Sequence, residues 1–216
     1  MRPQVVVLGA SGHAKVVIEI LEETREWNII GCTTTRELSG EVLNYPVLGS
    51  DDLLPALYGS GVRHALVGIG DNRLRRQVSR RAHEMGFALI NAVSPRAVVS
   101  PRARLGCGVV VMAGAVLNVD SIFGDGAIVN TRASVDHDCR VGPYAHIGPG
   151  VSLAGGVEVG EGAFLGIGSC VIPGVKIGPW AIVGAGAAVI KDVPERATVV
   201  GVPARVIRVR EQTTEL

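Results

Sequence analysis

The sequence has few aromatic residues and almost no net charge. Phe, Trp and Tyr make up 4% of its 216 residues while 47% are hydrophobic, so the core must use small and β-branched side chains. A net charge of +1 argues against a general polyanion binder, because nucleic-acid-binding domains carry a clear basic excess. No apolar run approaches the ~20 residues of a membrane span, so none is expected.

Features of secreted proteins are also missing. The chain runs directly into the apolar segment 5–8 with no basic region or cleavage site, so we expect no signal peptide. The four cysteines lie far apart, and their spacing fits neither a zinc site nor a compact disulfide framework. We therefore expect a soluble, reduced, cytoplasmic protein.

Glycine is abundant, at 29 residues, and a six-residue repeat fills the second half of the chain. Every sixth residue of this region is large and apolar, and these residues form a first ladder: Val99, Leu105, Val111, Leu117, Phe123, Val129, Val135, Val141, Ile147, Leu153, Val159, Leu165, Val171, Ile177, Val183 and Val189. A second ladder, from Ala103 to Val193, follows the first by four residues and contains only Ala, Val, Ser and Cys.

This period of six predicts stacked coils, because a helix repeats every 3.6 residues and a simple strand every two. A flexible Gly-rich linker is the alternative, but a linker would not keep an apolar register from Val99 to Pro194. The ladder stops where the next step reaches Glu195. We expect the φ > 0 of tight corners at the glycines that follow the large residues: 106, 124, 142, 148, 160, 166, 178 and 184. The prediction is an all-β parallel β-helix over 93–194, followed by a C-terminal tail over 195–216.

The first 92 residues predict a small Rossmann-like α/β domain. Residues 4–8, 28–32 and 64–70 are typical of buried parallel strands, and 15–22 of a helix. Asp71 is placed to cap a second helix that begins at Asn72.

The loop 9–14 between the first strand and helix could bind a phosphate or carboxylate at the helix N-terminus. A plain strand-to-helix turn is the alternative. NAD is disfavoured, because the loop is not GxGxxG and the second strand ends in Cys32–Thr35 without an acidic residue.

Two histidines, His137 and His146, fall within the repeat, and both avoid its inward positions, so we expect them to face outward. His137 beside Asp138 is a candidate general base, because a carboxylate orients an imidazole and stabilises its charged form. A surface histidine with a solvated acid is the alternative. A zinc site of the γ-carbonic anhydrase type is not expected, since it needs three histidine ligands.

The chain resembles the sugar O/N-acyltransferases of the sialic acid O-acetyltransferase and bacillosamine/perosamine N-acetyltransferase type. The resemblance covers almost the whole chain. It is carried by four motifs in order: Gly9–Val17, Gly68–Arg73, Asn130–Cys139 and Gly201–Arg205.

This resemblance implies a left-handed β-helix and a homotrimer with active sites between neighbouring subunits. The α/β domain would bind a nucleotide-linked amino sugar, and the β-helix would bind acetyl-CoA. His137 would be the general base and Asp138 the acid that raises its basicity. The remaining implied site residues are Ser11, Gly12, His13 and Gly70 for the sugar nucleotide, and His146, Ile167 and Ala185 for the CoA. Departures from the family pattern are Cys32–Thr34, where Asp residues often hold the nucleotide, and Asp138, where Glu is common.

We therefore predict an acetyl-CoA-dependent N-acetyltransferase that acts on a nucleotide-linked 4-amino-4,6-dideoxy sugar, without a metal. O-acetylation of a sialic-acid-type hydroxyl is one alternative, because the base does the same work on either acceptor. A non-catalytic trimeric scaffold that binds sugar nucleotides is the other, and the His137–Asp138 pair weighs against it. The nucleotide and the sugar are left open.

Overall fold

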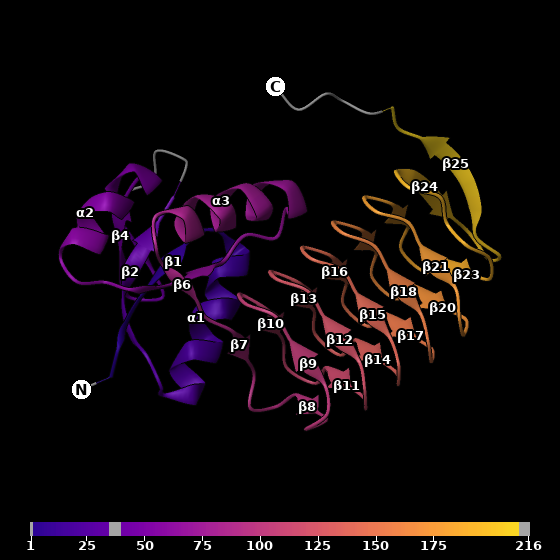
Figure 1. Ribbon diagram of the computed structural model, residues 1–216, viewed down its shortest axis with the longest axis horizontal. Helices are drawn as coiled ribbons and strands as arrows, with labels where there is room; N and C mark the ends of the chain where they lie inside the picture. The colour runs from indigo at the N-terminus through magenta and orange to yellow at the C-terminus, as the bar shows by residue number, and fades with distance from the viewer. Residues whose placement is uncertain (1, 35–39, 212–216) are drawn as a thin grey trace.

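The computed structural model describes residues 2–34 and 40–211 as an α/β domain beside a long stack of β-coils (Figure 1). Thr35 and residues 212–216 of the expected tail lie outside this description. The α/β domain holds a sheet in the order β3-β4-β2-β1-β5-β6. Its strands are β1 (Gln4–Leu8), β2 (Asn28–Thr33), β3 (Glu41–Val42), β4 (Tyr45–Gly49), β5 (His64–Val67) and β6 (Ala88–Leu89).

Helices cover both sides of this sheet: α1 (Gly12–Thr24), a short 3-10 helix η1 (Asp51–Leu53), α2 (Leu54–Gly59) and α3 (Asn72–Glu84). Alternate residues of β1 face opposite sides, so Val5 and Val7 pack with α1 while Val6 and Leu8 pack with α2 and α3. The expected cap is confirmed, because the Asp71 carboxylate accepts a hydrogen bond from the backbone N–H of Leu74 at 2.8 Å. Among the described residues, no helix is long and apolar enough to cross a bilayer.

The coils form a parallel β-helix with three flat faces, each a stack of short strands (Figure 1). Face 1 contains β7 (Ala92–Val93), β10 (Val110–Val111), β13 (Ile128–Val129), β16 (His146–Ile147), β19 (Phe164–Leu165), β22 (Ile182–Val183), β24 (Ala197–Val200) and β25 (Arg205–Val209). Face 2 contains β8 (Val98–Val99), β11 (Val116–Leu117), β14 (Ser134–Val135), β17 (Ser152–Leu153), β20 (Cys170–Val171) and β23 (Ala188–Val189). Face 3 contains β9 (Arg104–Leu105), β12 (Ile122–Phe123), β15 (Arg140–Val141), β18 (Glu158–Val159) and β21 (Lys176–Ile177).

The two ladders fill the interior of the coils. In each two-residue strand the second residue is the large ladder residue and points inward, so Val111 stacks over Val129 one coil later. Members of both ladders join one continuous buried cluster, which confirms the β-helix prediction. The last turn is shorter: Ile177 pairs with Val193 and Val183 with Val199. This shortening explains why the six-residue register ends at Glu195 although β24 continues face 1.

The glycines that follow the large residues do not have the expected positive φ, so that prediction was wrong. The left-handed position falls two residues later, at residues such as Gly108, Gly126 and Asp138. Gly148 and its equivalents are required for a different reason. A Cβ on Gly148 would stand 2.3 Å from the carbonyl oxygen of Leu165 in the next coil, so the close approach of backbones excludes any side chain.

The α/β domain packs on the first coils of face 1. Helix α1 shares a buried apolar cluster with Val110, Met112 and Ile128 of those coils. Arg75 of α3 is 1% exposed and joins the two parts of the molecule. Its guanidinium donates to the carbonyl oxygens of Ile69, Gly70, Gly126 and Tyr144 and to the side-chain oxygen of Asn72, at 2.7 to 3.1 Å.

Candidate active site

His137 and Asp138 lie on the corner between face 2 and face 3. The imidazole Nδ1 and the Asp138 Oδ2 are 2.8 Å apart, so Nδ1–H donates to the carboxylate and Nε2 is left as the proton acceptor. Asp138 has φ 59°, a left-handed conformation that Asp tolerates better than most residues. Both side chains are exposed, at 56% and 66%. The pair therefore has the geometry of a general base open to a ligand.

The surroundings of His137 favour its charged form. Its pKa is raised, first by the hydrogen bond with Asp138 and then by the negative charge of Asp136. The ring lies against Gly155 in the next coil, where an added Cβ would stand 2.5 Å from Cε1. A side chain at this position would have to displace the imidazole from its present place.

His146 points away from the coil interior, as expected, but it is not a surface residue. The α/β domain covers it, and it is 7% exposed. Its Nε2 lies 2.9 Å from the Asn130 amide nitrogen, and the Asn130 oxygen already accepts the N–H of Thr131. Nε2 is therefore an acceptor, which places the proton on Nδ1, 3.4 Å from the carbonyl oxygen of Gly70.

His13 lies beside His146, with ring centroids 6.2 Å apart. Burial and the nearby charge of Arg75 lower the pKa of His13 to about 4. Burial, Arg75 and His13 together lower the pKa of His146 to about 3. Both rings are neutral at physiological pH, so neither supplies charge to a ligand.

This buried pair predicts a loss of stability in mild acid. The unfolded chain takes up protons below pH 6.5, the ordinary histidine pKa, whereas folded His146 takes them up only near pH 3. The contribution of these histidines to the free energy of unfolding is therefore fully present above pH 6.5 and is lost as the pH drops toward 3. For His146 the loss at pH 5 is about 2 kcal/mol. Urea unfolding at pH 7.5, 6 and 5 measures this fall. His146→Gln should remove about half of this fall, because His13 contributes a similar amount, and the surface variant His83→Gln is the control. Equal slopes in all three proteins would contradict the assignment.

Residues of the loop 9–14 and Gly70 lie near the buried pair of His13 and His146. Ser11 is the N-cap of α1, but its side chain makes no capping hydrogen bond, and a Cβ on Gly12 would meet nothing within 4 Å. Gly70 lies over His13, with a would-be Cβ 3.9 Å from the ring. The four residues expected to hold a sugar nucleotide, Ser11, Gly12, His13 and Gly70, therefore lie at one edge of the sheet.

A carboxylate lies beside the last residue of β2, although the chain has no acidic residue in that part of its sequence. Buried Thr33 donates its hydroxyl to Asp51 of η1 at 2.5 Å. The acid comes from eighteen residues later in the chain. Sequence order alone could not have placed it.

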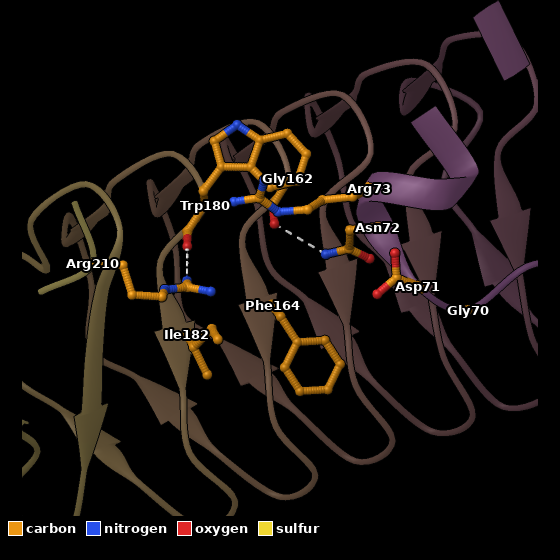
Figure 2. Close-up of a pocket in the computed structure, with 9 residues that line it drawn as sticks. All are labelled: Gly70, Asp71, Asn72, Arg73, Gly162, Phe164, Trp180, Ile182 and Arg210. Carbon is orange, nitrogen blue, oxygen red and sulfur yellow. Dashed lines mark hydrogen bonds between the residues drawn. The ribbon is translucent and has the colours of Figure 1, made fainter. Parts of the chain in front are cut away.

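A cavity of about 230 Å³ continues from the Gly70 loop along face 1 (Figure 2). Phe164 and Ile182 form its apolar wall, and Phe164 also packs edge-on against His146 at 5.2 Å. Two cations, Arg73 and Arg210, and the carboxylate of Asp71 line it. The Arg73 guanidinium lies 5.2 Å from the Trp180 ring centroid, and Arg210 donates to the Trp180 carbonyl oxygen. An apolar wall beside cations suits a ligand with a ring and phosphates.

Ile167 and Ala185 lie on the corner between faces 1 and 2, one directly above the other. The N–H of Gly186 bonds to the carbonyl oxygen of Ile167 at 2.9 Å, which fixes this stacking. Ile167 is 60% exposed. The corner thus offers an open edge, parallel to the coil axis, to an extended ligand.

The two halves of the expected site do not meet within one chain. His146 and the cavity lie on face 1, with His13 of α1 beside them, whereas His137 lies on the corner between faces 2 and 3. In a three-sided coil that corner is opposite face 1. Among the described residues there is also no group of three His, Cys, Asp or Glu side chains arranged to hold a metal.

Several residues of the site were missed by sequence reasoning. Gly155 and Asn118 lie one coil from His137 and Asp136, so an eighteen-residue alignment of the repeat would have found them. Nothing in the sequence distinguishes Arg75 from its arginine neighbours on α3. The aromatic and cationic lining, Phe164, Trp180, Arg73 and Arg210, comes from three distant segments.

Comparisons with known proteins show which proteins this chain resembles. Residues 4–82 match the family described as PglD N-terminal domain. Among curated protein sequences, none gives a significant match.

Solved structures give full-length matches. A mutant of GDP-perosamine N-acetyltransferase from Caulobacter crescentus, in complex with CoA and GDP-perosamine, is 51% identical; the match covers 94% of this chain and 96% of that one, with a TM-score of 0.92. The acetyltransferase domain of PglB from Neisseria gonorrhoeae, in complex with acetyl coenzyme A, is 38% identical over 96% and 100%, with a TM-score of 0.90. WeeI from Acinetobacter baumannii is 27% identical over 94% and 99%, with a TM-score of 0.82.

Proposed function

The chain belongs to the hexapeptide-repeat sugar N-acyltransferases, and from that premise we propose that GDP-perosamine is its acceptor and that His137 is its general base. It transfers an acetyl group from acetyl-CoA to the amine of a nucleotide-linked amino sugar. One observation carries the choice of acceptor: the 51% identity, over nearly the whole of both chains, to an enzyme that holds CoA and GDP-perosamine. The fold of this chain is the expected α/β domain followed by a left-handed β-helix.

In the proposed reaction the sugar amine attacks the thioester carbonyl carbon of acetyl-CoA. A C–N bond forms, the C–S bond breaks, and CoA leaves as a thiolate. His137 takes the amine proton on Nε2, because Nδ1 is engaged by Asp138 at 2.8 Å. Asp138 stabilises the imidazolium that results. No covalent enzyme intermediate is needed.

The sugar nucleotide is assigned to the α/β domain, over residues 1–92, with Ser11, Gly12, His13 and Gly70 as contacts. The cavity beside Gly70 supports this assignment, since Arg73 of α3 suits a diphosphate, and Arg210 from the C-terminal segment lines the same cavity. The CoA is assigned to the β-helix, over 93–194. His146, Ile167 and Ala185 are its proposed contacts, and the open edge at Ile167 fits an extended pantetheine arm.

A homotrimer with shared active sites is part of the proposal. His137 lies opposite face 1 in its own chain, so a second copy must bring its His137 to the face 1 cavity of the first. The outward residues of the faces support this arrangement. Four of the five outward residues of face 3 are charged, which suits a face exposed to solvent: Arg104, Ile122, Arg140, Glu158 and Lys176. Face 2 is uncharged and suits a subunit contact: Val98, Val116, Ser134, Ser152, Cys170 and Ala188.

The cytoplasm is the proposed compartment. All four cysteines are free thiols, as is common in reducing surroundings.

A thiol-release assay tests the acceptor. Purified protein is given acetyl-CoA with GDP-perosamine, with UDP- and dTDP-linked 4-amino sugars, or with sialic acid as a hydroxyl acceptor. We expect the highest kcat/KM with GDP-perosamine and N-acetylation of the product by mass spectrometry. Faster release with a UDP- or dTDP-linked sugar would overturn the choice of nucleotide, and transfer to sialic acid alone would overturn N-acetylation.

A further inference from the structure

Asp136 precedes the base and has a different role from Asp138. Its Oδ1 accepts the backbone N–H of His137 at 2.8 Å. The same oxygen accepts the Asn118 amide at 3.0 Å, and Asn118 lies one coil earlier. Asp136 thus ties the backbone of the base to the neighbouring coil without touching the imidazole.

Backbone hydrogen bonds from the preceding coil also hold the segment around His137 in place. The Asn118 N–H bonds to the carbonyl oxygen of Val135, and the Asp138 N–H bonds to that of Val119. The segment 135–138 is therefore fixed to segment 118–119 by two backbone bonds and by the Asp136 side chain. On the opposite side Gly155 leaves room for the ring to settle. The position of the imidazole depends on this frame.

Building on the proposed role of His137, we infer that Asp136 is a positioning residue for the base, anchored by Asn118, and that its charge makes the imidazole more basic. Asp138 holds the ring through Nδ1, while Asp136 holds the backbone and adds negative potential. The pKa of His137 is raised, as this effect requires. The hydrogen bond with Asp138 is the largest cause, and the negative charge of Asp136 is the next.

Within the described part of its own chain, the ring has few other charged neighbours in the coils on either side. The preceding coil contributes Asp120, which is exposed and has the same left-handed backbone as Asp138, with φ 58°. The following coil contributes Ala154, Gly155 and Gly156, none of which is charged. Asp120 is therefore a matched control: it carries the same charge on the same corner, but its charge is not among the causes of the raised pKa of His137.

The test separates charge from shape. Asp136→Asn keeps an oxygen for both hydrogen bonds and removes only the charge, whereas Asp136→Ala removes both. Histidine ¹³C NMR follows the titration of His137 in the free trimer, and the pH profile of kcat/KM follows it in catalysis. We expect Asp136→Asn to move both midpoints to lower pH and to keep kcat at pH 8. We expect Asp136→Ala to lower kcat at pH 8 by about tenfold or more, because a misplaced base reacts slowly.

Asp120→Asn should leave both midpoints and kcat unchanged. An unshifted midpoint in Asp136→Asn, or an equal shift in Asp120→Asn, would overturn the electrostatic part. Full kcat in Asp136→Ala would overturn the positioning part. The NMR titration needs no substrate, so it remains informative if His137 is not the base; that failure would appear separately, as an active His137→Ala.

Discussion

Replacing His137 by alanine is expected to lower kcat by roughly 10²- to 10⁴-fold, the contribution of a positioned general base. The amine that attacks the thioester must lose a proton, and the Nε2 of His137 is the acceptor placed for it by the Nδ1 bond to Asp138. His137 is exposed on a corner and makes no core contact, so its loss should leave folding unchanged. Thiol release gives kcat, and analytical ultracentrifugation gives the mass of the assembly.

The control is His83→Ala, which removes an exposed histidine of α3 far from the corner. His83→Ala should keep the wild-type rate. A rate within tenfold of wild type in His137→Ala would remove His137 from the mechanism.

The same variant tests whether the site is shared between subunits. Phe164→Arg fills the face 1 cavity with a charged side chain and should be inactive by itself. Mixed trimers of His137→Ala and Phe164→Arg contain interfaces where an intact His137 meets an intact cavity. Co-expression should therefore recover a measurable fraction of activity. Mixtures as inactive as either parent would place the whole site in one chain.

Replacing Arg75 by methionine is expected to lower the free energy of unfolding by roughly 3–5 kcal/mol, because several acceptor oxygens lose a charged donor and each unsatisfied buried group costs about 1–3 kcal/mol. The melting temperature should fall by about 10 °C for a chain of this size. Arg75 is 1% exposed, and its five hydrogen bonds join the Gly70 loop and α3 to two coil corners. Methionine fills the space but leaves four buried carbonyl oxygens without this donor. Burial lowers the pKa of Arg75 to about 10, so the native side chain remains charged near neutral pH.

Arg80→Met, on the exposed side of the same helix, is the matched control. It should shift the melting temperature by no more than a degree or two. Arg75→Lys keeps the charge but cannot reproduce the planar fork, so it should recover only a small part of the loss. Equal melting temperatures for Arg75→Met and Arg80→Met would show that the contacts between domain and coil do not stabilise the fold.

The repeat made most of the fold predictable. One large and one small residue every six positions predicts stacked coils, so the interior residues from Val99 to Val189 could be named in advance. The same six-residue register predicted that His137 faces outward, and the neighbouring Asp138 identified it as a candidate base. The role of the glycines was misread: a repeat shows where glycine recurs, but not whether φ or the next backbone requires it.

Tertiary structure decided everything that joins separate parts of the chain. The burial of His146 depends on the α/β domain that covers face 1, and the carboxylate at Thr33 depends on the return of Asp51. Arg75 became the buried arginine because α3 crosses a coil corner at that residue. The sequence by itself determined the coil, because its period is local and repeats with every turn. The site required the fold, because its groups come from distant segments and meet only after docking.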